Sequence, residues 1–411
     1  MTAHPTAHPG ASGWRYLGVA ALVALPALLL RLTGTHLPPV AGALVFGLGI
    51  MGAAFLISWS AEAAEGDISQ ALALAFLAFI AVLPEYAVDL YFAWTAPFEP
   101  AHRQLAIANM TGANRLLIGI GWPVIFGLFW LKTRRTKLEI DRSHALELSF
   151  LAAATLYSFT IPLRGHLSLI DTVVLGALFA AYVVLAARRP VAAPEHVGPA
   201  AAIGSLPTGR RRVTLVVLFL YSAAAIFAAA EPFAEGLVAI GTQWGISEFL
   251  LIQWVAPLAS ESPEFIIASL LALRGRPSAA MAALVSSKVN QWTLLVGSLP
   301  LAYGISGGSL QPMAFDERQT EEVLLTAAQS AFAVAVFVSM SLSKWEALAL
   351  VALFVTQLFV SDLQSRLLYA YGYLVLTVVF LIWQRRDLRP FIVSAWEAAR
   401  SQETAAPHAR K

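Results

Sequence analysis

Runs of apolar residues about as long as a bilayer is thick follow one another along most of the chain. Crossing the hydrocarbon core takes about 20 apolar residues in a helix, and the sequence predicts twelve such spans. They lie near residues 14–32, 39–63, 70–95, 103–131, 144–163, 168–187, 213–233, 246–273, 279–304, 320–341, 345–361 and 366–384. Only 13% of the 411 residues are charged, whereas soluble domains average about 25%. We therefore expect an all-α polytopic membrane protein.

The chain contains no cysteine. This excludes disulfides, thiolate nucleophiles, and zinc or iron–sulfur sites held by cysteine. Residues 1–13 are rich in Pro, Ala and His without an apolar pattern, and we expect them to form a disordered tail. Because no small-residue cleavage pattern follows the first apolar run, we expect 14–32 to be an uncleaved span rather than a signal peptide.

Basic residues are concentrated in four of the predicted connections. They occur in 132–142, in 188–212, in the turn at 274–276 and in 385–411. Lys and Arg are enriched in cytoplasmic loops, and all four segments fall on the cytoplasmic side if the N-terminus is cytoplasmic. The sequence therefore predicts a multi-pass protein of the cell membrane, N-in and C-in, with a cytoplasmic linker at 188–212 and a cytoplasmic tail at 385–411. The acidic segment 315–322 is expected to lie outside.

Two stretches of the chain place Pro-Glu in the middle of an apolar run. The first reads FIAVLPEYAVDLYFAW (79–94) and the second PLASESPEFIIASLLAL (257–273). Each precedes a helix whose polar residues end in an asparagine, Asn114 or Asn290, with a glycine seven residues later. Five predicted helices separate the starts of the two units, and an odd number inserts them in opposite directions. Inverted repeats around polar, interrupted helices are typical of secondary transporters.

The paired Pro-Glu helices, each followed by a Gly- and Asn-containing helix, resemble the two α-repeats of the sodium/calcium exchanger superfamily, the cation/Ca²⁺ antiporters. The resemblance implies two inverted five-helix repeats, 39–187 and 213–361, with 14–32 and 366–384 as additional spans. It implies a secondary antiporter, not an enzyme, that moves Ca²⁺ or a related cation in exchange for Na⁺ or H⁺ by alternating access. No cofactor is implied beyond these transported ions. The expected partners are inorganic cations and the lipid bilayer, without nucleic acid.

The Pro-Glu pairs provide oxygen atoms of the kind that bind a hard cation. A proline within a helix leaves the carbonyl four residues earlier without its donor, here Ile80 before Pro84 and Ala259 before Pro263. Ca²⁺ takes about 6–8 oxygen ligands, which include carboxylates and carbonyls. The candidate ligands are Glu85, Asp89, Asn109, Asn114, Ser260, Glu261, Glu264, Ser286 and Asn290.

The resemblance assigns roles within this set. Glu85 and Glu264 would be the central ligands, Asn109 would open the motif after the first Pro-Glu, and Ser260 would supply a hydroxyl. The closing asparagines of the two motifs would serve mainly in helix packing.

The sequence departs from the family pattern near the expected site. Ala81 and Val82 stand where hydroxyl ligands for Na⁺ are expected, and Glu261 stands where a third hydroxyl is expected. Lys288 replaces a glycine, and Arg115 follows the first closing asparagine. Two carboxylates close together cannot both stay charged without a cation. We therefore expect proton coupling to outweigh coupling to several Na⁺ ions.

Other interpretations stay open at this point. Glu85 and Glu264 can be structural, each paired with Arg115 or Lys288, and Asp89 can lie near the membrane boundary. Lys288 is about 200° around the helix from the second closing asparagine, so we expect it to face away from the site. The chain can also be a degenerate transporter fold used as a sensor or scaffold. An intramembrane enzyme fits less well, because the sequence has no His-Glu-x-x-His motif, P-loop or cysteine.

Overall fold

The structure, a computed structural model, describes residues 11–64, 83–188, 198–360 and 362–400. Within these residues the chain forms helices, turns and four short strands, and nine helical segments are long and apolar enough to cross a membrane. The all-α prediction is confirmed. Its physical basis is that backbone groups inside a bilayer must be hydrogen-bonded within the protein, which a helix achieves along its whole length.

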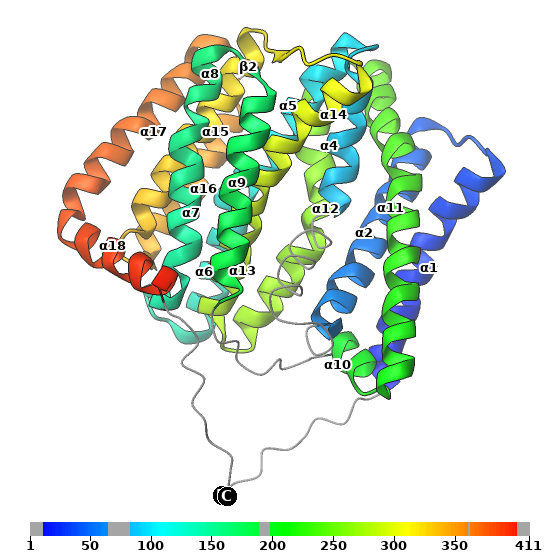
Figure 1. Cartoon of the computed structure of the whole chain (residues 1–411), viewed down its shortest axis with the longest axis horizontal. Coiled ribbons are helices and arrows are strands. Elements are labelled where there is room, and N and C mark those ends of the chain that lie inside the picture. The colour runs from blue at the N-terminus through cyan, green and yellow to red at the C-terminus, as the bar shows by residue number, and fades with distance from the viewer. Residues whose placement is uncertain (1–10, 65–82, 189–197, 361, 401–411) are drawn as a thin grey trace, which may run out of the picture. The chain divides into compact units, whose positions relative to one another are not determined.

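The first of two compact units has α1, α2 and α11 as its main helices, side by side in Figure 1. Its elements are α1 (Ala11–Thr33), α2 (Pro39–Ala64), the start of α4 (Leu83–Thr95), α10 (Pro199–Gly204), α11 (Thr208–Trp244), and two parts of α12 (Glu248–Leu273). Small residues let these helices approach closely. A Cβ on Gly52 would lie 2.7 Å from the Ala20 carbonyl oxygen, and one on Gly236 would lie 3.2 Å from the Ala43 Cβ. Such contacts are the usual means of packing between transmembrane helices.

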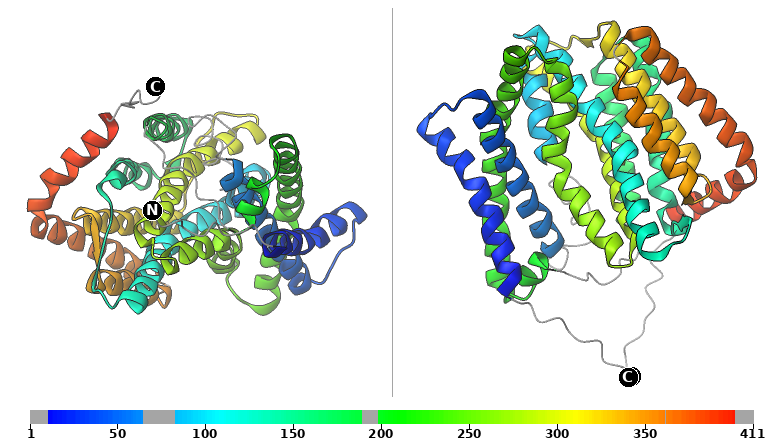
Figure 2. Two further views of the ribbon diagram at one scale, coloured as in Figure 1. Left: turned by 90° about the horizontal axis from the view of Figure 1, so that it is seen from below. Right: turned by 180° about the vertical axis from the view of Figure 1, so that it is seen from behind.

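The second compact unit contains most of the helices. It comprises the remainder of α4 and α12 with α5 (Pro100–Leu116), η1 (Leu117–Gly121), α6 (Trp122–Thr133), η2 (Arg142–His144), α7 (Ala145–Ser158), α8 (Thr160–Arg164), α9 (Leu169–Ala186), α13 (Pro277–Asn290), η3 (Gln291–Leu295), α14 (Val296–Ser306), α15 (Glu317–Phe337), α16 (Lys344–Leu358), α17 (Leu363–Trp383) and α18 (Arg385–Arg400). Within it α15 packs on α17, α5 and α7, and α9 packs on α14. The right-hand view of Figure 2 shows α15 and α17 running side by side.

Two small antiparallel sheets connect loops of the second unit. Strand β1 (Lys137–Glu139) pairs with β4 (Ser341–Ser343), and Leu138 lies opposite Leu342. Strand β2 (His166–Leu167) pairs with β3 (Met313–Ala314), and His166 lies opposite Ala314. Each pairing joins segments more than 140 residues apart in the sequence.

The helices agree with the predicted spans in type and differ at their ends. Residues 11–13, expected in the disordered tail, already belong to α1, and α11 extends well beyond the predicted span 213–233. The predicted linker 188–212 contains α10 and the first residues of α11. Of the predicted span 70–95, the residues before Leu83 lie outside the described part of the chain. The number of spans therefore stays a prediction.

The compact units do not coincide with the predicted repeats. The first unit combines α2, from the repeat expected at 39–187, with α11, from the repeat expected at 213–361. The two motif helices nevertheless share a local feature. A π-helical segment, η1 or η3, follows the closing asparagine of each motif, beginning at Leu117 or Gln291. Short π-helical segments within α-helices are often found at functional sites, and this pair matches the sequence repeat.

Candidate cation site

Four of the predicted carboxylates lie on the Pro-Glu helices α4 and α12. Glu85 is 2% exposed, Asp89 and Glu261 are fully buried, and Glu264 is half-buried. A charged side chain at the centre of a membrane helix costs at least roughly 2.5 kcal/mol, so it is rare and usually functional. The first four residues of the stretch 79–94, which include Ile80, Ala81 and Val82, lie outside the described part of the chain.

Asp89 on α4 lies near the side-chain amide of Asn109 on α5. Both residues belong to the second unit. Both side chains are buried. Neither carboxylate oxygen of Asp89, nor Oδ1 of Asn109, has a partner at hydrogen-bonding geometry within the described residues. Buried polar atoms are nearly always bonded. The carboxylate and amide oxygens of these two side chains are of the kind that a hard cation binds.

Glu264 is held by a neighbour on the next helix. The Ser287 hydroxyl on α13 donates to Oε2 of Glu264 over 2.5 Å. The predicted ligand was instead the preceding residue, Ser286, whose hydroxyl is 2.7 Å from that of Tyr182 on α9. The structure thus brings Ser287 to Glu264, whereas Ser286 joins α13 to α9.

Asn114 is engaged at every side-chain heteroatom. Its Nδ2 donates to the Met110 carbonyl over 2.8 Å, and its Oδ1 accepts from the Lys288 ammonium over 2.7 Å. Lys288 is fully buried, and its ammonium lies 4.5 Å from the centroid of the Trp292 ring. Lys288 was expected to face away from the site, and its ammonium reaches across to Asn114 on the helix α5. Asn114 therefore joins α5 to α13, in agreement with the packing role that the resemblance implied.

Helix α5, which follows the first Pro-Glu helix, packs against α12 at a glycine. A Cβ on Gly112 would lie 1.8 Å from the backbone oxygen of Gln253, so only glycine fits at this contact. The contact lies between Asn109 and Asn114 on α5. Close backbone approach therefore fixes the part of α5 that presents the candidate ligand Asn109.

Sequence reasoning missed a group of four charged side chains in the second unit. This buried charge cluster consists of Arg115, Glu321, Glu322 and Arg366, from α5, α15 and α17. Arg115 donates to Oε2 of Glu322 over 2.5 Å, Arg366 donates to Oε2 of Glu321 over 2.9 Å, and Arg366 also pairs with Glu322. Gln253 donates to Glu322 over 2.9 Å. The cluster has two positive and two negative groups, so opposite charges are paired within it.

The buried charge cluster corrects two expectations. Arg115 does not neutralise Glu85 or Glu264, because its Nη2 bonds Glu322 and its other two nitrogens have no hydrogen-bond partner within the described residues. The acidic end of 315–322, expected in an outside loop, is buried in α15. The sequence did offer one indication of this cluster, because an arginine within a membrane helix usually needs an acidic partner.

Two candidate ligands have less specific surroundings. Ser260 and Asn290 are buried, and each interacts with neighbouring groups. Within the described ranges no three His, Asp or Glu side chains lie close enough together to hold one metal ion. The structure places Asp89 beside Asn109 and Glu264 beside Ser287.

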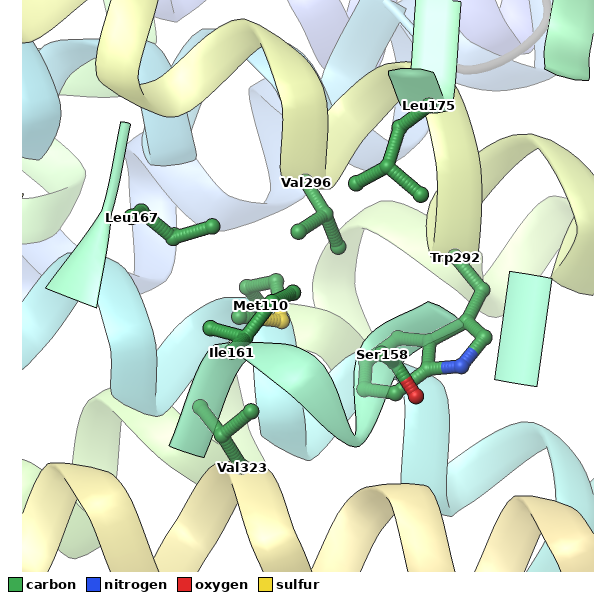
Figure 3. Close-up of a pocket in the computed structure, with 8 residues that line it drawn as sticks. All are labelled: Met110, Ser158, Ile161, Leu167, Leu175, Trp292, Val296 and Val323. Atoms are coloured by element: carbon green, nitrogen blue, oxygen red, sulfur yellow. The ribbon is translucent and has the colours of Figure 1, made fainter. Parts of the chain in front are cut away.

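A crevice in the second unit, shown in Figure 3, is lined mainly by apolar side chains, unlike the surroundings of the candidate carboxylates. It is too narrow for a water molecule and has no acidic side chain in its lining. Its lining is Met110, Ser158, Ile161, Leu167, Leu175, Trp292, Val296 and Val323. The Ser158 hydroxyl already donates to the Thr155 carbonyl over 2.7 Å. This crevice is apolar packing and offers a cation no ligands.

Comparisons with known proteins identify relatives of the chain. The sequence pattern of the family described as "Sodium/calcium exchanger protein" matches residues 38–188 and 214–363. The structure described as that of the H⁺/Ca²⁺ exchanger CAX is 43% identical, with a TM-score of 0.91 over 94% of this chain and 98% of that chain. Comparison with curated protein sequences found no match.

Two more distant structures share the fold. Native YfkE is 16% identical, with a TM-score of 0.60 over 86% of this chain and 99% of that chain. The sodium-calcium exchanger NCX_Mj is 16% identical, with a TM-score of 0.51 over 78% of this chain and 98% of that chain. At this identity the likeness concerns the fold alone.

Proposed function

Since the chain belongs to the sodium/calcium exchanger protein family, a family of membrane cation antiporters and not of enzymes, we propose that it exchanges Ca²⁺ for H⁺ across the cell membrane. The observation that carries this proposal is the group of buried oxygens of Asp89 on α4 and Asn109 on α5, with the buried Glu85 on the same helix as Asp89. The 43% identity to a structure described as an H⁺/Ca²⁺ exchanger supports H⁺ rather than Na⁺ as the counter-ion.

The proposed cation ligands are the carboxylates and the oxygens next to them. They are Glu85, Asp89, Asn109, Ser260, Glu261 and Glu264. Ser287 would orient Glu264 through its hydrogen bond. Asn114 and Ser286 would hold the motif helices through Lys288 and Tyr182 rather than bind the cation.

The proposed topology has both termini in the cytoplasm and the two repeats inserted in opposite directions. The basic segments at 132–142, 188–212 and 385–411 support the orientation. The matched π-helical segments η1 and η3 support the repeat. In this arrangement alternating access would expose the carboxylates to one side of the membrane at a time.

Cysteine labelling tests this orientation, because the chain has no cysteine of its own. A cysteine at Gly209 should be protected from a membrane-impermeant thiol reagent in intact cells, and one at Leu310 should react. Both positions are exposed on the structure. Reaction of Gly209→Cys from outside, with protection of Leu310→Cys, would reverse the proposed sides.

Proton coupling predicts a specific effect of Glu261. Two carboxylates three residues apart on one helix face, Glu261 and Glu264, cannot both stay charged without a cation. One would be protonated and would release its proton when Ca²⁺ binds. Glu261→Ser should therefore weaken the pH dependence of Ca²⁺ uptake into vesicles and increase its dependence on Na⁺. Glu317→Gln, which changes an exposed carboxylate on α15, is the matched control. Native uptake that needs a Na⁺ gradient and ignores pH would contradict the coupling.

A further inference from the structure

Helix α18 lies where the sequence predicted only a cytoplasmic tail. It starts at Arg385, two residues after α17 ends at Trp383, and Figure 1 shows that it turns away from the direction of α17. Seen from below in Figure 2, α18 lies at the edge of its unit beside α17. The change of direction follows directly on a helix long and apolar enough to span a membrane.

The end of α17 shows where α18 lies relative to lipid. Val375, Val379 and Ile382 follow one another at helical spacing, and each is more than half exposed. A stripe of exposed aliphatic residues on a membrane span faces hydrocarbon. Trp383 closes this helix and is exposed, which suits the aromatic belt at the membrane–water interface. Helix α18 therefore begins at the level of the lipid headgroups.

One face of α18 packs on its own unit. Phe391 and Ser394 are buried, and the helix contacts α7 and η2. Gln384, buried at the corner before α18, places its side-chain amide 3.4 Å from Oε1 of Glu346. These contacts fix which face of α18 points outward.

The outward face combines basic and apolar side chains. Arg385, Arg389, Ile392 and Trp396 recur at the spacing that places them on one helix face, and all four are exposed. Ile392 is 63% exposed and Trp396 is 57% exposed. Across α18 as a whole there are four arginines and two acidic residues. Amphipathic helices that lie in the lipid interface carry Lys or Arg on their polar side and Trp, Phe or Leu on their apolar side, and the exposed surface of α18 has arginines near its start and Ile392 and Trp396 further along.

We propose that α18 is an interfacial anchor that binds the anionic surface of the bilayer. Arg385, Arg386 and Arg389 contact the negatively charged headgroups, and Ile392 and Trp396 insert between the headgroups and the acyl chains. Charge complementarity supports an anionic leaflet, because basic segments next to a membrane span are attracted to it. The apolar side chains require a bilayer rather than a free anion.

Hydrogen exchange of the full chain in lipid nanodiscs tests the anchor. Amides of 385–400 should exchange roughly tenfold more slowly in mixed phosphatidylcholine–phosphatidylglycerol discs than in phosphatidylcholine discs. The triple variant Arg385→Gln/Arg386→Gln/Arg389→Gln should lose this difference. The variant Arg134→Gln/Arg135→Gln, which changes two exposed arginines after α6, should keep it. Ile392→Ser/Trp396→Ser should exchange faster than the native chain in the anionic discs.

Several outcomes would overturn the proposal. Equal exchange of α18 in neutral and anionic discs would show that the arginines do not bind lipid. Protection that glycerophosphoglycerol in solution reproduces in neutral discs would identify a free-anion site instead. If α18 is protected only in discs that hold two copies of the protein, whatever the lipid, then a second copy of the chain and not the bilayer covers this helix. The Ca²⁺ uptake of each variant, measured in parallel, shows that it is folded and separates failure of the anchor from failure of the proposed transport.

Discussion

Replacing Glu264 by glutamine is expected to reduce Ca²⁺ uptake into vesicles roughly a hundredfold at Ca²⁺ concentrations below saturation. The substitution keeps the size of the side chain and removes one negative ligand. Leaving a buried charge without its partner costs about 3 kcal/mol or more, and every 1.4 kcal/mol or so is a factor of ten in affinity. Glu85→Gln should have a similar effect, because the sequence repeat places the two carboxylates at matched positions.

Two further variants make this result specific. Ser287→Ala removes the hydrogen bond to Glu264 without removing a charge, so uptake should fall by several-fold rather than by two orders of magnitude. Glu317→Gln changes an exposed carboxylate and should leave uptake unchanged. Near-normal uptake by Glu264→Gln would mean that this carboxylate has a structural role and that the cation binds elsewhere.

Replacing Glu322 by glutamine is expected to destabilise the protein by about 3–5 kcal/mol, because it leaves a buried charge uncompensated. Glu322 is fully buried and pairs with both Arg115 and Arg366. After the substitution, two buried arginines would share the single carboxylate of Glu321. The midpoint of thermal unfolding in detergent should therefore fall clearly, and α17 should be the first helix to lose protection from hydrogen exchange.

A double-mutant cycle distinguishes charge from packing. Glu322→Gln/Arg115→Met restores equal numbers of positive and negative groups in the buried charge cluster. It should recover part of the stability that Glu322→Gln loses. If Glu322→Gln melts at the native temperature, or if the double variant is less stable than the two single effects combined, charge pairing does not hold α15 to its neighbours.

The helices could be predicted from the sequence because the bilayer imposes their length and their polarity. Apolar runs gave the positions of α1, α2, α9 and α17 to within a few residues. The same counting missed α18, whose arginines and acids interrupt any apolar run. An amphipathic helix at a membrane interface is recognised by the separation of its polar and apolar residues onto different faces. A count of consecutive apolar residues does not detect this separation.

The carboxylates of the candidate site could be predicted from the sequence, but the residues that contact them could not be predicted as well. Glu85 and Glu264 stand out because the sequence repeats Pro-Glu within apolar runs. The partner of Glu264 is Ser287 and not the adjacent Ser286, and a helical spacing rule does not separate two neighbouring hydroxyls of this kind. Lys288 reaches Asn114 because a lysine stem spans the gap between helices, whatever the direction of its Cα–Cβ bond.

The buried charge cluster shows why contacts between distant segments escaped prediction. Arg115 and Glu322 are 207 residues apart in the sequence. Glu321 and Glu322 lie at the start of a predicted span, where acidic residues ordinarily mark a solvated helix end. Only the packing of α15 against α5 and α17 shows that these acids are buried.

If Ca²⁺ displaces protons from buried carboxylates, the purified protein must release protons when it binds Ca²⁺, and measuring this release is the most direct test of the proposed exchange. In weakly buffered detergent solution without Na⁺, adding Ca²⁺ near neutral pH should acidify the solution in proportion to the Ca²⁺ bound. Glu264→Gln should release fewer protons, and Glu317→Gln should behave as the native chain does. Binding of Ca²⁺ with no release of protons, at an affinity that does not change with pH, would contradict the exchange of Ca²⁺ for H⁺.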